Sequence, residues 1–470
     1  MMETWFFPSL TFLMLFLPIT VGLYFLMPGI RGKNTVLLIA SLLFYAWGEP
    51  MWVLVLAGLT LLVWLCSAAV AKWKRSWARR LALSVGVLGP MAVLAWVKYA
   101  GFLFAPVLGL AGITLPEVVM PLGISFFTFQ IVTYAVDVYR QPELYQKNPL
   151  DLLLYISCFP QLVAGPIVRY QDVADQMSRR QTTMEDFTEG MKRFVCGLGK
   201  KVILANVCGM AVSAVVENQA LYGMSVLGGW YMAIVYSLQI YFDFSGYSDM
   251  AIGMGRIFGF RYAENFNYPY ASKSIAEFWR RWHISLGTFF REYVYIPMGG
   301  NRVSRIRQLW NLLVVWGLTG LWHGANLNFV LWGLYYFVLI ALERFVFKPV
   351  LDRLPGLLRG LMTYALVLVG WIIFYFTDTS ELVMYLKSLV GIGAGEMLPL
   401  FTGELWMVIR QYSWFPLVAL AAAFPLWKAI RQEVLDRLGG VYMAWLAAVL
   451  VLSVLMIVGQ SYNPFIYFRF

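Results

Sequence analysis

The most constraining feature of this sequence is a succession of apolar runs long enough to cross a lipid bilayer, joined by short loops that carry basic residues. Hydrophobic residues make up 60% of the chain and charged residues only 13%. A soluble protein does not carry so little charge over such a length. Because a spanning segment must satisfy its own backbone hydrogen bonds, these runs predict helices. We therefore expect an all-α polytopic membrane protein and exclude a soluble enzyme.

A net positive charge is also typical of proteins that bind nucleic acid. Lys and Arg together number 36 and Asp and Glu 25, which gives a net charge of +11. The basic residues stand in the short loops between apolar runs, where a preference of positive charge for the cytoplasmic side explains them. We therefore expect contact with membrane lipid and no nucleic acid.

The apolar runs predict a series of crossings. We expect spans at residues 5–27, 34–47, 51–71, 81–97, 121–139, 227–244, 361–376, 412–427 and 442–458, and an interrupted region at 101–116. The first run begins with the acidic Glu3 and lacks a cleavage pattern, so it predicts a retained helix and not a signal peptide. The basic loops then place both termini outside.

Two segments are predicted to enter the membrane and turn back. The run at 159–167 is broken by Pro160, Gly165 and Pro166 and is flanked by basic residues on both sides, which favours a re-entrant hairpin. The run at 309–347 is also basic at both ends, so we expect a turn near residues 323–326. A helix from 309 to 323 rises about 21 Å and would bury its last residue past the middle of the bilayer.

Residues 274–290 predict one amphipathic helix lying in the membrane interface. Ser274 and Glu277 have the spacing of a capping box, which marks a helix start. The apolar face comprises Ile275, Phe278, Trp279, Trp282, Leu286, Phe289 and Phe290, and the polar face Glu277, Arg280 and Arg281.

The chain has only two histidines, His283 and His323. A neutral imidazole can take a proton near pH 7, so both are candidates for proton transfer. His323 stands deep in an apolar run, where an ionisable side chain is costly unless it faces a cavity or a partner. His283 stands at the edge of the apolar face of 274–290, where a structural hydrogen bond to an indole or the backbone is the alternative.

Several segments resemble the membrane-bound O-acyltransferase family, and most closely its bacterial branch that contains the alginate O-acetylation membrane protein. The resemblance is carried by EFWRRWHISL at 277–286, REYVYIPMGGNR at 291–302, GLWHGA at 320–325, MPLGISFFTFQ at 120–130, FPQLVAGPI at 159–167, GKK at 199–201 and DFSGYSD at 243–249. It implies one transmembrane domain over residues 1–470, with a catalytic core at about 120–346. By the same resemblance His323 is the catalytic base, and His283 stands at the family's histidine or asparagine position.

The resemblance also implies the reaction and its partners. The donor is a cytosolic acyl-CoA, acetyl-CoA in this branch, with no metal, and the membrane is the bacterial cytoplasmic membrane. The acceptor is an extracytoplasmic protein of the SGNH-hydrolase type, which passes the acetyl group to a polysaccharide. Because donor and acceptor come from opposite sides, we expect a ring of tilted helices around a thinned centre at His323, with the re-entrant and interfacial helices at its border.

Residues near the two histidines are candidates for binding the donor. Arg280, Arg281, Lys273 and Arg302 could hold phosphates of coenzyme A, although plain positive-inside topology explains any one of them. Asn326 and Trp322 are candidates for the acyl end, and with His283 for the oxyanion.

Other polar residues favour structural roles. Lys200 and Lys201 are expected to snorkel to the interface, with phosphate contact as the alternative. Asp243 and Asp249 match no metal loop, so we expect an orienting role. Cys66, Cys158, Cys196 and Cys208 lack metal-ligand spacing and are expected to pack between helices.

The sequence departs from the branch at a few positions: Met298, Glu292, Leu327 and Asn328. Two other functions stay open. A D-alanyl transferase for teichoic acids belongs to the same family but draws on a carrier-protein thioester. A transporter or scaffold for polysaccharide would not need a histidine base.

Overall fold

The structure is a computed structural model that describes residues 7–109, 120–163, 165–393, 395–412, 414–426 and 438–459. Within these ranges the regular structure is helical, apart from one isolated bridge between Ile392 and Met397. The chain divides into two compact units. Unit 1 comprises Met1–Phe194 and Tyr247–Glu264, and unit 2 comprises Val195–Gly246 and Asn265–Phe470.

Six helical segments of the described chain are long and apolar enough to cross a membrane. They are Trp52–Lys72, Ser76–Gly101, Met184–Tyr222, Leu327–Leu351, Gly356–Tyr375 and Gly439–Gly459. These segments confirm that the protein is an all-α, multi-pass membrane protein. The predicted spans at 81–97 and 442–458 each fall within one of them, and those at 51–71 and 361–376 each extend one residue beyond one of them.

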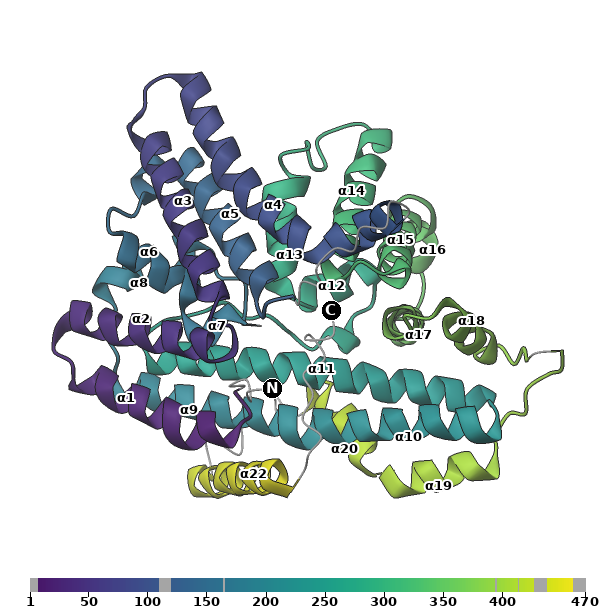
Figure 1. Cartoon of the computed structure of the whole chain (residues 1–470). Helices are drawn as coiled ribbons and strands as arrows, with labels where there is room; N and C mark the ends of the chain where they lie inside the picture. The colour runs from purple at the N-terminus through teal and green to yellow at the C-terminus, as the bar shows by residue number, and fades with distance from the viewer. Residues whose placement is uncertain are drawn as a thin grey trace. The chain divides into compact units, whose positions relative to one another are not determined.

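Unit 1 is built from the N-terminal helices. Its elements are η1 (Phe12–Phe16), α1 (Leu17–Leu26), α2 (Gly29–Gly48), α3 (Trp52–Lys72), α4 (Ser76–Gly109), α5 (Ile124–Arg140), η2 (Pro142–Leu144), α6 (Pro149–Ser157), α7 (Phe159–Leu162), α8 (Tyr170–Arg179) and most of α9 (Met184–Gly199). Helices α3, α4 and α5 pack against one another, and α2 packs on α6 (Figure 1).

Several boundaries in unit 1 differ from the predicted ones. Helix α4 continues past Gly101 to Gly109, so the expected interruption at 101–116 does not begin at Gly101. Residues 110–119 lie outside the described part of the chain. The first apolar run contains the apolar helical segment Phe12–Leu26, which is shorter than the six candidate crossings, and the second run lies within α2 (Gly29–Gly48).

A break in the helical path stands at the predicted re-entrant segment 159–167. Helix α6 ends at Ser157, α7 covers only Phe159–Leu162, and the backbone is irregular over residues 165–169. The side chain of Tyr155 donates a hydrogen bond to the carbonyl of Val168 at 2.7 Å, which ties the two sides of this break together. The break is confirmed, while its orientation in the membrane stays a prediction.

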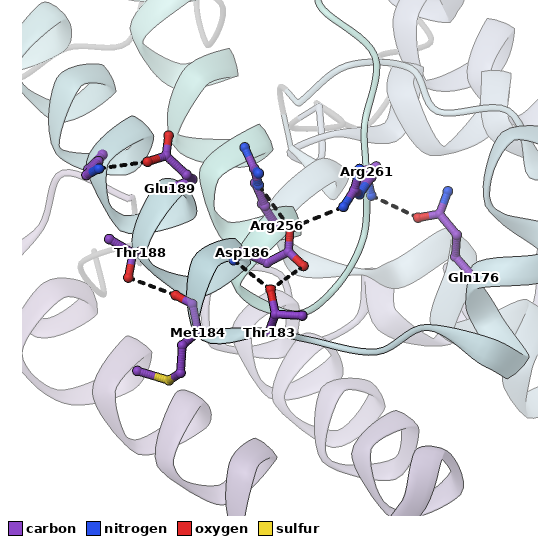
Figure 2. Close-up of polar contacts among 9 residues, drawn as sticks. Gln176, Thr183, Met184, Asp186, Thr188, Glu189, Arg256 and Arg261 are labelled. Carbon is purple, nitrogen blue, oxygen red and sulfur yellow. Dashed lines mark hydrogen bonds and ion pairs between the residues drawn. The ribbon is translucent and has the colours of Figure 1, made fainter. Parts of the chain in front are cut away.

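A polar cluster in unit 1 holds the start of α9 (Figure 2). Thr183 caps the helix, because its Oγ1 accepts the backbone N–H of Asp186 at 3.0 Å and donates to the Asp186 carboxylate at 3.0 Å. The same carboxylate accepts hydrogen bonds from Arg256 at 3.2 Å and Arg261 at 3.4 Å. Asp186 therefore joins the start of α9 to the residues at and after the end of α11.

Unit 2 contains the rest of the helices. Its elements are η3 (Lys200–Ala205), α10 (Asn206–Tyr222), much of α11 (Val226–Ile257), η4 (Pro269–Ala271), α12 (Ile275–Arg281), α13 (Ile284–Phe290), η5 (Arg291–Tyr295), α14 (Arg305–His323), α15 (Leu327–Leu342), η6 (Glu343–Phe347), α16 (Lys348–Leu351), α17 (Gly356–Tyr375), α18 (Thr379–Ser388), α19 (Gly403–Tyr412), α20 (Trp414–Ala422) and α22 (Gly439–Gly459). Helix α15 packs between α14 and α17 in contact with both (Figure 1).

The predicted span at 412–427 is described only in part. Helix α20 covers Trp414–Ala422, and residues 413 and 427 lie outside the described part of the chain, so the crossing stays a prediction. The buried residues Pro416 and Ala419 of α20 pack within unit 2. The basic loop predicted to follow it, with Lys428, Arg431 and Arg437, lies outside the described residues.

Candidate active site

Helices α14 and α15 form a hairpin that turns at the predicted place. Ser304 caps the start of α14, and His323 is the last residue of that helix. The backbone of Gly324 is extended, and α15 begins after Asn326. The turn expected at 323–326 is confirmed, and it leaves the imidazole of His323 at a helix end.

The ring of His323 lies among aromatic side chains and is 6% exposed. Ring centroids stand 4.8 Å from Trp322, 4.9 Å from Trp332 and 5.0 Å from Phe374, all near perpendicular. These neighbours come from α14, α15 and α17. The imidazole therefore lies among aromatic side chains of unit 2.

Two glycines bring the backbones of this hairpin into close approach. A Cβ added at Gly320 would lie 2.4 Å from the carbonyl oxygen of Phe329, and one at Gly333 would lie 2.5 Å from the carbonyl oxygen of Trp316. No side chain fits at either position without a shift of backbone. The backbones of α14 and α15 therefore approach closely at Gly320, within one turn of His323.

We expect Gly320→Ala to disturb the active site. The added methyl must push α15 away from α14, a strain of about 1–3 kcal/mol, and displace the aromatic rings around His323. Thermal stability should fall, and so should any activity that depends on the position of His323. Gly317→Ala is the matched control, since a Cβ at Gly317 meets nothing within 4 Å, and it should leave both unchanged. Equal behaviour of the two variants would contradict this account.

The single amphipathic helix expected at 274–290 is wrong, because the chain breaks at His283. Helix α12 ends at Arg281, and α13 starts at Ile284. Between them, His283 adopts a left-handed backbone conformation with φ of 45°. Such a conformation is uncommon for a residue other than glycine, and its strain is found most often at functional sites.

The start of α12 is firmly capped. The Ser274 hydroxyl accepts the N–H of Glu277 at 3.0 Å, as the capping box predicts, while the Glu277 carboxylate accepts the N–H of Lys273 at 2.9 Å. Glu343, from η6, accepts the N–H of Ile275 at 2.6 Å. These bonds hold α12 in place and so position the break that follows it.

His283 is buried, with 2% of its surface exposed. Its Nδ1 lies 3.2 Å from Oδ1 of Asn265, and its ring packs edge-on to Phe244 at 4.6 Å. Burial lowers the pKa of His283 from 6.5 to about 3, so the imidazole is neutral near pH 7. The role of Asn265 could not be predicted from the sequence, because this residue lies in an irregular linker, 18 residues before His283.

Trp322 joins the two histidines. Its ring lies 4.8 Å from that of His323 and 6.0 Å from that of His283. Unit 2 therefore brings the two histidines of the chain against one buried indole, although they stand 40 residues apart in sequence (323 − 283 = 40). Of the other candidate residues, Asn326 lies in the turn after His323 with an exposed side chain.

The basic candidate residues differ in side-chain exposure and in pairing with acidic side chains. Arg281 is paired with Glu277 at 2.7 Å. Lys273, Arg280 and Arg302 have exposed side chains, Lys273 beside Gly356 at the start of α17. Arg280 and Arg281 end α12, directly before the break at His283. Exposed cations of this kind suit an anionic ligand.

The expectation that Lys201 snorkels to the interface is wrong. Its side chain is 1% exposed and pairs with Asp243, itself 3% exposed, at 2.7 Å. Its Nζ also donates to Oδ1 of Asn206 at 2.8 Å. Lys201 lies in the π-helical segment η3, and such segments are frequent at functional sites.

The remaining polar candidates have structural partners. Asp249, in unit 1, pairs with Arg193 at 2.7 Å, so both carboxylates of 243–249 orient basic side chains as expected. The four cysteines are free thiols, and Cys208 is part of the buried core of unit 2. Among the described residues no three His, Cys, Asp or Glu side chains gather as metal ligands do.

Comparison with known proteins identifies the family. Residues 137–386 match the model of the membrane-bound O-acyltransferase family. A probable alginate O-acetylase, AlgI, of Pseudomonas putida is 36% identical and covers 99% of this chain and 100% of its own length. A peptidoglycan O-acetyltransferase of Helicobacter pylori is 31% identical over 81% of this chain and 79% of its own length. A teichoic acid D-alanyltransferase of Bacillus subtilis is 33% identical but covers 48% of this chain and 60% of its own.

The match covers the segments that build the site. Residues 137–386 include η3 with Lys201, the break at His283 and the hairpin that ends at His323. The relatives with long coverage are named as O-acetylating enzymes. This multi-pass membrane protein is thus an O-acyltransferase that belongs to the membrane-bound O-acyltransferase family.

Proposed function

We propose that the protein moves an acetyl group from cytosolic acetyl-CoA to an extracytoplasmic hydroxyl, for O-acetylation of a cell-surface polysaccharide such as alginate. The observation that carries this proposal is the placement of two buried histidines, each at a helix break, against Trp322. A ring of tilted helices around a thinned centre at His323, reached from both faces, is part of the proposal.

In this reaction His323 is the general base. A neutral imidazole in apolar surroundings takes the proton of the acceptor hydroxyl as its oxygen attacks the thioester carbonyl. The carbon–sulfur bond then breaks, the thiol of coenzyme A leaves, and the proton on His323 returns to the leaving sulfur. Trp322 packs on His323 and limits the directions in which its ring can turn.

The donor would be held by the basic residues at the end of α12 and near it. Arg280, Lys273 and Arg302 present exposed cations for the phosphates of coenzyme A, and Arg281 could exchange Glu277 for a phosphate. Asn326 and Trp322 lie next to His323 and would contact the acyl end. The chemistry needs no metal ion.

The named relatives support the choice of acceptor. Two of them are named for O-acetylation, one of alginate and one of peptidoglycan, and both cover most of this chain. We propose alginate or a similar polysaccharide as the final acceptor, with an SGNH-hydrolase-type protein outside the cytoplasmic membrane as the intermediate carrier. The D-alanyltransferase covers less of this chain, which makes D-alanyl transfer the second candidate.

The donor can be tested on the purified protein. Protein in nanodiscs is incubated with labelled acetyl-CoA or, separately, with a D-alanyl thioester on a carrier protein. Label released from acetyl-CoA or transferred to a hydroxyl acceptor supports the proposal. Release from the carrier-protein thioester alone would establish the D-alanyl alternative. A transporter or scaffold would turn over neither donor and would keep its cellular function after loss of both histidines.

Orientation gives a separate prediction. Single cysteines are introduced into a protein that lacks the four native cysteines. A cysteine at Met51, close to Glu49, or at Thr379 should react with an impermeant thiol reagent added from outside. Cysteines at Lys74 and Arg305 should react only after the membrane is opened. All four positions are exposed, so access to the reagent depends on the side of the membrane. Labelling of Arg305→Cys from outside would place the donor site on the wrong face.

A further inference from the structure

The linker after α11 carries a buried asparagine that contacts the break at His283. Asn265 is 1% exposed. Its Oδ1 lies 3.2 Å from Nδ1 of His283, 3.1 Å from the backbone nitrogen of Ser285 and 2.9 Å from the Ser285 hydroxyl. Its backbone carbonyl also accepts the N–H of Ile284 at 3.0 Å. Asn265 therefore binds both the left-handed residue and the first turn of α13.

The backbone N–H of Ser285 determines which way the Asn265 amide points. A backbone N–H only donates, so the side-chain atom that faces it must be an acceptor, the oxygen. If the amide were reversed, its NH2 group would face the N–H of Ser285 at 3.1 Å, and two donors would oppose each other. The amide oxygen would then take the present position of Nδ2, which has no hydrogen-bond partner among the described residues. The oxygen of Asn265 thus faces His283.

The amide orientation in turn determines the tautomer of the imidazole. An amide oxygen cannot donate, so the proton between it and Nδ1 must belong to His283. The Ser285 hydroxyl is compatible with this arrangement, since it can donate to Oδ1 of Asn265 and accept from Nδ1 of His283, 3.4 Å away. A neutral ring with its proton on Nδ1 carries a lone pair on Nε2.

We propose that Asn265 is a positioning residue that holds His283 in the Nδ1–H tautomer, so that His283 takes part in acyl transfer as an acceptor through Nε2. The oxyanion then needs another donor, because a nitrogen with a lone pair cannot stabilise negative charge by donation. In this role Nε2 receives an O–H or N–H of a substrate, either the acceptor hydroxyl or an amide of the pantetheine arm. The catalytic part of this inference rests on the proposed acyl transfer, whereas the tautomer does not.

The low pKa of His283, about 3, extends the tautomer over the working pH range. A histidine with an ordinary pKa near 6.5 becomes an imidazolium as the pH falls below that value and then donates from both nitrogens. Burial of His283 with a neutral amide and aromatic rings as neighbours keeps the ring neutral. Nε2 therefore stays an acceptor from about pH 8 to about pH 5.

The tautomer can be measured directly, because the chain has only two histidines. Full-length His323→Gln protein, labelled with ¹³C and ¹⁵N in histidine, contains one ring whose nitrogens are resolved by solid-state NMR. We expect a protonated Nδ1 and an unprotonated Nε2, unchanged between about pH 8 and pH 5. A proton on Nε2, or an imidazolium in this range, would overturn the proposal whether or not acetyl-CoA is the donor.

Variants of Asn265 test the positioning role in the active protein. Asn265→Leu removes the acceptor at similar volume and should lower acyl transfer on the order of 10- to 100-fold, as loss of a partner that orients a functional histidine does. Asn265→Asp keeps an acceptor oxygen and should recover part of the rate and the Nδ1–H signal. Asn267→Leu is the control, since this exposed asparagine contacts Arg281 through its backbone.

The outcomes separate the two claims. Full activity in folded Asn265→Leu, or equal loss in the Leu and Asp variants, would overturn the positioning role. The substrate group is identified with His283→Asn, which should raise the KM for acetyl-CoA if the pantetheine amide binds Nε2, and the KM for the acceptor if its hydroxyl does. No change in kcat or in either KM would refute the role of His283. Absence of acetyl-CoA turnover in wild type would refute the proposed donor and leave the tautomer to the NMR result.

Discussion

His323→Ala is expected to lower acyl transfer by about 10²–10⁴-fold, the range of a lost general base, and to leave the protein folded in the membrane. The imidazole packs on Trp322, Trp332 and Phe374, so its removal leaves a cavity within an otherwise intact aromatic cluster. Activity is measured as transfer of labelled acetyl from acetyl-CoA, and folding as the thermal transition of the purified protein.

The control for this variant keeps the volume of the side chain but removes its basicity. His323→Gln fills most of the space of the imidazole and supplies hydrogen bonds but cannot take a proton near pH 7, so it should be as inactive as the alanine variant. Near-normal transfer by folded His323→Ala would mean that His323 has only a structural role.

Substitution of one partner of the Lys201–Asp243 pair should lower the free energy of unfolding by about 3–5 kcal/mol, the largest stability effect expected. The reason is that the remaining charge stays buried without its counter-charge. Lys201→Met leaves the Asp243 carboxylate without its cation, and Asp243→Leu leaves the ammonium without its anion. The double variant removes both charges and should be more stable than either single variant. Unfolding free energies in mixed micelles measure all three.

An exposed pair provides the comparison. Lys192 and Glu189 lie 2.7 Å apart with side chains 24% and 39% exposed, so Lys192→Met should cost less than about 1 kcal/mol. If Lys201→Met is no more destabilising than Lys192→Met, the buried pair does not hold η3 against α11. Additive effects of the two single changes in the double variant would lead to the same conclusion.

The elements around the site could be predicted where the signal is local in sequence. Apolar runs of sufficient length identified α3, α4, α17 and α22, since bilayer thickness sets the length of a crossing. The turn after His323 followed from basic residues at both ends of one apolar run. The helix start at Ser274 followed from its capping box.

The failures have non-local causes. The apolar residues of 274–290 keep a helical spacing on both sides of His283, although the φ of His283 is 45° and ends the helix there. The spacing of apolar residues gives no information on a single backbone dihedral angle. Lys201 was expected at the interface, but its partner Asp243 stands 42 residues away (243 − 201 = 42). Asn265 has no signature of its own and is recognised only by the groups that converge on its oxygen.

The central claim is that a thioester on one side of the membrane acylates a hydroxyl on the other through His323. The most direct measurement uses vesicles containing protein of one orientation, with labelled acetyl-CoA confined to the cytoplasmic face and a hydroxyl acceptor confined to the opposite face. We expect labelled acceptor with wild-type protein, none with His323→Gln, and none when the donor is moved to the outer face. Labelling that persists in His323→Gln, or that is equally fast with the donor on either face, would contradict the proposed mechanism.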